Sequence, residues 1–444
     1  MASISRTLGR LVGCRALLGA GLALSSVGAA PGATPSADAR RYARESAAAL
    51  ANHDLKAALA LMEKAVALRP DHQSYLTALA GLQMVNQRPS DATATLNQLA
   101  RMGLSLSRHE DESFAPLRDS PEFRDVARQL RANRDPLGPG RVLFELPAMT
   151  GIIEGIACRV ATGDYFFGDV RHRCIWRQRP DGSVRPFSPA GAGLFGVFGL
   201  AVDQARGSLW AATTAVEEME GYRPADRNRA ALVEFALADG RVRRSAALPA
   251  DGAGHVLGDL TVAADGTVYA TDSLAPVIWR LPPEAAQPQR WLQSDEFESL
   301  QGIGVLAGGT TLVVSDYGKG VFLIDRATRA IRLLTPPPDS TLLGVDGLAA
   351  VPDGSVVAVQ NGTEPRRVIR LRIDAAARMV VRLDVLERGH PAMADPTLGT
   401  LVGDQFVFVG NAGWDRFAPG GPADPAAPRA IPILATRLPA PPRK

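Results

Sequence analysis

The stretch "VDGLAAVPDGSVVAVQNG" at residues 345–362 contains two short apolar runs on either side of a Pro-Asp-Gly-Ser turn. Glycine, proline and aspartate between apolar runs are typical of tight turns, so the stretch predicts two antiparallel strands. Asp346 stands directly ahead of the first strand. It has two possible roles, either a turn residue that binds backbone groups or a ligand of a metal ion above an active site.

The same pattern recurs five more times along the chain. First strands begin at "EGIACRV" (154), "FGLAVDQ" (198), "GDLTVAA" (258), "QGIGVLA" (301) and, in a degenerate form, "PTLGTLV" (396). A second and a third strand follow each of them, as "DYFFGDV" and "RCIWRQR" do in the first copy. Six such copies predict a mainly β fold, a six-bladed β-propeller at residues 141–438. We expect the segment 141–148 to add the outer strand of the last blade and close the ring.

Residues 37–135 have a different texture, rich in alanine and leucine and without strand alternation, which predicts an α-helical domain. Ala58, Met62, Ala65 and Pro70 have the small, large, small and breaker spacing of a tetratricopeptide helix pair, and Ala92 follows Ala58 by 34 residues. The domain is therefore predicted to be tetratricopeptide-like. It serves either as a helical bundle packed for stability or as a binding surface for a protein partner.

The first 30 residues predict a secretory signal peptide, because three arginines precede a short apolar run that ends in small residues. We therefore expect an exported protein, periplasmic or secreted, without a membrane span after the signal is removed. The formal net charge of +3 includes Arg6, Arg10 and Arg15 in this segment, so the mature chain is near neutrality. This charge argues against a nucleic-acid partner.

Two cysteines, Cys158 and Cys174, then remain in the mature chain. The predicted strands place them on two strands separated by a third, which is too far for a disulfide bond. We expect two free, buried thiols.

The first strands of a propeller surround its central channel and start from one face, so the residues that open them converge on one mouth. These residues are Glu154, Phe198, Gly258 or Asp259, Gln301, Asp346 and Thr397. Calcium binds six to eight oxygen ligands, and Glu154, Asp259, Gln301 and Asp346 could supply oxygens from four blades. The alternative is that these side chains only cap turns. His255 lies in a loop at the same face, either as a proton carrier or as a solvated surface histidine.

The six-copy pattern, with "EG" opening the first blade and "DG" the fifth, resembles the family that groups senescence marker protein, gluconolactonase and luciferin-regenerating enzyme. In that family a glutamate of the first blade, asparagines of the third and fourth, and an aspartate of the fifth bind one divalent metal, usually calcium. The aspartate also serves in hydrolysis of a lactone or phosphoester. The resemblance implies these roles for Glu154 and Asp346. The chain departs from the family at Gly258 with Asp259 and at Gln301, which replace the asparagines.

Two functions follow as expectations. The first is a calcium-dependent hydrolase of lactones or related esters, with calcium or another divalent metal on Glu154, Asp259, Gln301 and Asp346, and with Asp346 and His255 as catalytic residues. The second is a non-catalytic propeller that binds a small ligand or a protein partner. The sequence contains no nucleophile-elbow serine, zinc-type cluster or phosphate-binding glycine loop that would suggest another chemistry.

Overall fold

The computed structural model describes residues 35–417 and 429–439. The predicted signal peptide at residues 1–30 lies outside the described residues. None of the helices in the described ranges is both long and apolar enough to cross a membrane. The chain divides into two compact units. One is helical and ends at Asp135, although it also takes in the short segments 338–341 and 363–365, and the other is the β-propeller.

The helical unit is a succession of helices, each packed on the one before it through α5. They are α2 (Pro35–Ala51), α3 (Leu55–Leu68), α4 (Gln73–Val85), α5 (Pro89–Arg101), α6 (Arg108–Ser113) and α7 (Pro121–Ala132). Ala58, Met62 and Ala65 are buried on one side of α3 and pack against Leu79 of α4, as the repeat pattern predicts. The helix α7 packs on α5 and completes a second apolar core.

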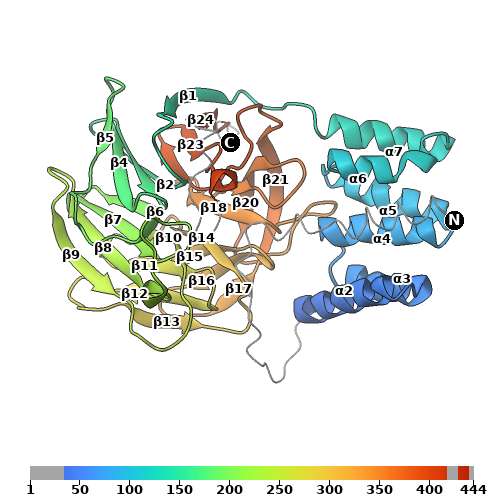
Figure 1. The fold of residues 1–444 in the computed structure, drawn as a ribbon, viewed down its shortest axis with the longest axis horizontal. Coiled ribbons are helices and arrows are strands. Elements are labelled where there is room, and N and C mark those ends of the chain that lie inside the picture. Colours follow the sequence, from blue (N-terminus) through green and yellow to red (C-terminus); the bar gives the residue numbers. More distant parts are fainter. Residues whose placement is uncertain (1–34, 418–428, 440–444) are drawn as a thin grey trace. The chain divides into compact units, whose positions relative to one another are not determined.

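The second unit confirms the predicted six-bladed propeller (Figure 1). The first blade consists of β2 (Ile153–Arg159), β3 (Asp164–Asp169), β4 (Cys174–Gln178) and β5 (Val184–Pro186). The second consists of β6 (Gly196–Asp203), β7 (Ser208–Thr214), β8 (Ala230–Ala236) and β9 (Val242–Ala247). The third consists of β10 (Leu257–Val262), β11 (Val268–Asp272), β12 (Val277–Leu281) and β13 (Gln289–Gln293). The fourth consists of β14 (Leu300–Val305), β15 (Thr311–Asp316), β16 (Gly320–Asp325) and β17 (Ile331–Leu333). The fifth is β18 (Val345–Ala350), β19 (Val356–Gln360), β20 (Arg367–Asp374), β21 (Met379–Arg388).

The sixth blade closes the ring. It contains β22 (Gly399–Val402), β23 (Gln405–Val409), β24 (Ile431–Arg437) and, as its outer strand, β1 (Arg141–Leu146). The strand β1 pairs antiparallel with β24, so residues near the two ends of the propeller sequence share one sheet, as predicted. The inner strands contact one another around the ring in the order β2, β6, β10, β14, β18 and β22.

Each blade has four strands, whereas the sequence pattern indicates only three in the first five copies. The missed outer strands are short or have exposed polar side chains, as β5 and β17 do with only three residues each. The apolar signal is concentrated in the three inner strands, because these are packed between neighbouring sheets. The thiols of Cys158 and Cys174 are free, on β2 and β4 with β3 between them, although Cys174 is only partly buried.

Aspartates at the ends of second strands hold the loops that lead into the inner strands. Asp169 accepts a hydrogen bond from the Gly151 amide at 2.9 Å, and Asp272 accepts one from the Val256 amide at 3.1 Å. Asp316 accepts two such bonds from the loop before β14. These bonds fix where the inner strands of three blades begin, and therefore where the residues at the channel mouth lie.

Candidate functional site at the channel mouth

A β-bulge at the start of the inner strand occurs in each of the first five blades. A bulge places two residues opposite one and re-aims a side chain. The bulged pairs are Glu154–Gly155, Phe198–Gly199, Gly258–Asp259, Gln301–Gly302 and Asp346–Gly347. The residues predicted to surround the mouth are therefore equivalent positions of one recurring local structure.

The second position of the bulge is glycine in four blades because the next inner strand lies too close for a side chain. A Cβ on Gly199 would lie 2.6 Å from the Cα of Asp259, and one on Gly302 would lie 2.6 Å from the Leu348 nitrogen. The third blade reverses the order and has glycine first. Its Asp259 thus takes the position that is glycine elsewhere.

This reversal gives the Asp259 carboxylate backbone partners. Its Oδ1 accepts the Leu260 amide at 2.8 Å, and its Oδ2 accepts the Ile303 amide of the neighbouring blade at 3.3 Å. Burial raises the pKa of Asp259 to about 7, although both of these hydrogen bonds oppose the rise. Asp259, which the sequence predicts as a metal ligand, thus has one oxygen bonded within its own strand and the other bonded to the neighbouring blade.

Glu154 and Asp346 come from the first and fifth blades and influence each other's protonation. Burial, followed by the charge of Asp346, holds the pKa of Glu154 well above its usual value. Burial also raises the pKa of Asp346 to about 7, and the charge of Asp395 contributes. Two carboxylates that share a poorly solvated space resist being ionised together, so this pair favours a bound proton or cation.

The Glu154 carboxylate is held by an aromatic side chain from the sixth blade. The indole Nε1 of Trp414 donates a hydrogen bond to Glu154 Oε1, and the Trp414 ring lies 6.3 Å from that of Phe198. Trp414 packs at the edge of an apolar cluster with Val216 and Met219 of the insertion after β7. Nothing in the sequence paired Trp414 with Glu154.

Two amide side chains accompany the carboxylates. Asn361 donates from Nδ2 to Asp346 Oδ2 at 2.6 Å and to the Pro396 carbonyl at 2.9 Å. Gln301 donates from Nε2 to Ser299 at 3.0 Å, and its Oε1 accepts a long bond of 3.4 Å from Ser273. Both amides are thus oriented by neighbours at the same mouth.

Asp395 is a further carboxylate that the sequence interpretation missed. Its charge helps to raise the pKa of both Glu154 and Asp346, and burial raises its own pKa. The signal available in the sequence was its place in "DPTLG", just before the inner strand of the sixth blade. That blade has the most degenerate repeat, which concealed the equivalence.

His255 is buried, and both of its ring nitrogens contact carboxylates. The side chain is 3% exposed, and its Nδ1 lies 2.6 Å from Asp272 Oδ2 while its Nε2 lies 3.0 Å from Asp251 Oδ1. Its ring also packs edge-on against Trp279. The burial of His255 contradicts the solvated alternative, while its catalytic role stays a prediction.

The oxygen groups at the mouth fit a hard cation better than a zinc-type metal. Within residues 35–417 and 429–439, no three His, Cys, Asp or Glu side chains group as metal ligands. The fitting donors are the two carboxylates of Glu154 and Asp346 with the amide oxygens of Gln301 and Asn361. Calcium accepts such a mixture of carboxylate and amide oxygens.

An apolar layer lies below the bulges. It consists of the first residue after the bulge in five blades, namely Ile156, Leu200, Leu260, Ile303 and Leu348, and of Leu398 just before β22. A cavity of about 280 Å³ is lined by these side chains, by Asp259 and by residues that follow the inner strands, such as Val160 and Gln204. Asp259 therefore borders this cavity, whereas Glu154 and Asp346 do not line it.

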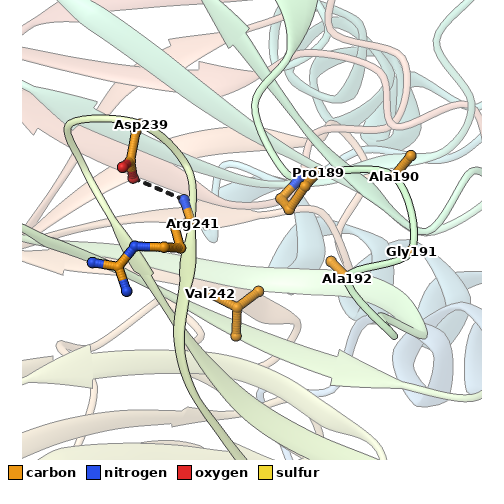
Figure 2. Close-up of a pocket in the computed structure, with 7 residues that line it drawn as sticks. All are labelled: Pro189, Ala190, Gly191, Ala192, Asp239, Arg241 and Val242. Carbon is orange, nitrogen blue, oxygen red and sulfur yellow. Dashed lines mark hydrogen bonds between the residues drawn. The ribbon is translucent and has the colours of Figure 1, made fainter.

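A larger hollow of about 550 Å³ lies between the loop 189–192 and the turn that joins β8 to β9 (Figure 2). Its polar side chains are Asp239 and Arg241, and Asp239 accepts the Arg241 amide at 3.0 Å across the turn. None of the residues predicted for the mouth lines this hollow. We therefore place the candidate site at the channel mouth.

Residues 49–103 match the tetratricopeptide repeat family model, which agrees with the predicted helical repeat. No curated protein sequence matches the chain. Among solved structures, the chain is similar to a gluconolactonase from Xanthomonas campestris, with 19% identity, a TM-score of 0.46, and coverage of 69% of this chain and 92% of that one. A luciferin-regenerating enzyme has 14% identity and a TM-score of 0.45, covering 68% and 95%.

A third similar structure is the aldose sugar dehydrogenase from Streptomyces coelicolor in its PQQ-bound form, with 16% identity, a TM-score of 0.45, and coverage of 68% and 99%. Two of the three carry names from the family that the sequence resembles. Because the three names denote different activities, the likeness assigns none of them to this chain.

Proposed function

We propose that the protein is a divalent-metal-dependent hydrolase of small lactones or related esters, with its site at the channel mouth. The observation that carries the proposal is the pair of half-buried carboxylates of Glu154 and Asp346, whose mutual repulsion a dication would relieve. The lactone class comes from the resemblance of these two positions to the gluconolactonase family. Calcium fits the oxygen donors best.

A cation bound at the mouth would supply Lewis-acid polarisation of the substrate carbonyl. Trp414 and Asn361 orient the two carboxylates through the hydrogen bonds that they donate to Glu154 and Asp346. Asp346 Oδ2 accepts the Asn361 bond, which leaves Oδ1 to take a proton from the attacking water. The water oxygen bonds to the carbonyl carbon, the ring C–O bond breaks, and the proton passes to the leaving oxygen.

The test is hydrolysis of a panel of sugar and aliphatic lactones, followed by acid release, with calcium and with chelator. We expect turnover with calcium only, and its loss in Asp346→Asn. Glu145→Gln is a matched control, because Glu145 is an exposed carboxylate on β1. Failure of every lactone and ester in the presence of saturating calcium would count against the hydrolase.

A second candidate is a non-catalytic propeller that binds a small ligand at the mouth, with a protein partner on the helical unit. The tetratricopeptide match at residues 49–103 favours it, since such repeats form extended binding surfaces. In this case calcium and chelator would leave the melting temperature unchanged.

We also propose that the protein is exported, because residues 1–30 have the pattern of a secretory signal. N-terminal sequencing of the protein from periplasmic and culture fractions tests this.

A further inference from the structure

The side-chain oxygen of Asn361 is buried and has no hydrogen-bond partner among the described residues. Native proteins pair nearly all buried polar atoms, so an unpaired acceptor needs an explanation. Asn361 follows directly after β19, and Gln360 at the end of that strand pairs with Val345. This register places Asn361 beside the bulge that carries Asp346.

The orientation of the Asn361 amide is determined by its other end. Its Nδ2 donates both to Asp346 Oδ2 and to the Pro396 carbonyl, and the carbonyl can only accept. Rotating the amide by half a turn would direct its oxygen at a carboxylate and a carbonyl, which is unfavourable. The unpaired Oδ1 is therefore a fixed feature of this site.

At the bulge of the third blade, no side-chain oxygen is without a hydrogen-bond partner. Gly258 has no side chain, and both oxygens of Asp259 accept backbone amides. The remaining oxygen groups at the mouth are the carboxylates of Glu154, Asp346 and Asp395 and the amide of Gln301. Since two carboxylates already balance a dication, a further neutral oxygen adds a ligand without adding repulsion.

We infer that Asn361 is a metal ligand, with its Oδ1 binding a calcium ion together with Glu154, Asp346 and Gln301; this inference rests on the proposed metal site. Asn361 thereby has two functions, because one end of its amide orients Asp346 and the other contacts the ion. Calcium satisfies the acceptor that the protein itself leaves unpaired.

The test is calcium binding to the full chain, measured by titration calorimetry and by the rise in melting temperature over chelator. We expect Asn361→Leu to weaken calcium affinity by at least about tenfold. Asn228→Gly is the matched control, because Asn228 lies in the insertion after β7 at φ 66°, which glycine adopts freely. It should bind calcium as the wild type does.

Asn361→Asp is a second variant, which distinguishes the loss of a metal ligand from a disturbance of the local structure. It keeps an oxygen at the same place but adds a carboxylate beside Asp346, so the metal-free protein should melt lower and calcium should raise the melting temperature by more than in the wild type. Equal calcium affinity in wild type and Asn361→Leu would overturn this inference alone and leave the proposed function standing. Absence of calcium binding to the wild type would overturn both.

Discussion

Trp414 donates its indole hydrogen bond to the carboxylate of Glu154 across 260 positions of the chain. Glu154 opens the first blade and Trp414 follows the second strand of the last, so this bond depends on closure of the ring by β1 and β24. It makes the mouth of the channel sensitive to the integrity of the whole propeller.

Removing this donor should destabilise the metal-free protein. Trp414→Phe keeps an aromatic ring but loses the bond to Glu154, which we expect to lower the free energy of unfolding by about 1–3 kcal/mol, as for other hydrogen bonds to carboxylates. Melting curves in chelator measure the effect. In the Glu154→Gln background the same substitution should cost less, because the charged acceptor is gone. Equal losses in the two backgrounds would assign the effect to packing.

The carboxylate pair should oppose folding when no metal is present. Glu154→Gln and Asp346→Asn each remove one half-buried charge, so both should raise the melting temperature in chelator above neutral pH and abolish the further rise caused by calcium. Lactone turnover should fall by at least about a hundredfold in Asp346→Asn. Glu145→Gln should behave as the wild type in all three measurements. A calcium response retained by both site variants would place the ion elsewhere.

Asp259 should make stability depend on pH. Its pKa is raised from 3.8 to about 7 in the folded chain, so between these values the folded state keeps a proton that the unfolded state has lost. Its contribution is therefore present at low pH and lost as pH rises towards 7, with a slope of up to about 1.4 kcal/mol per pH unit.

The comparison is between wild type and Asp259→Asn in chelator, with unfolding free energies measured from pH 4 to pH 8. The free energy of unfolding of the variant should fall less over this interval than that of the wild type. The changed hydrogen bond to Ile303 shifts the whole curve of the variant without altering its slope. Parallel curves would mean that Asp259 does not hold the proton.

His255 should matter for stability and not for chemistry. His255→Phe removes one hydrogen-bond partner from each of Asp272 and Asp251, which should cost about 1–3 kcal/mol even though Asp272 keeps its bond from Trp279. The folded fraction should keep the wild-type kcat on a lactone substrate. His109→Asn, at an exposed position of the helical unit, is the control. A large fall in kcat at unchanged folded fraction would support the catalytic role.

Much of the fold could be predicted because its signals are local. Turn residues between short apolar runs recur in six copies, and the small and large positions around Ala58 recur in the helical unit. Equivalence between copies was also enough to place Glu154, Gln301 and Asp346 at one mouth. Outer strands such as β5 and β17 were missed because, with three residues each, they are too short to show strand alternation.

The sequence by itself determined the number of blades, the strand that closes them and the carboxylates that open the first and fifth inner strands. Only the tertiary structure decided what each polar side chain contacts. Asp259 bonds the next blade, His255 is enclosed by two carboxylates, and Asn361 is left with an unpaired oxygen. The physical reason is the distance along the sequence between the residues that interact. Turns and strand alternation follow from neighbours in sequence, whereas hydrogen-bond partners and burial follow from segments that meet only when the ring is complete.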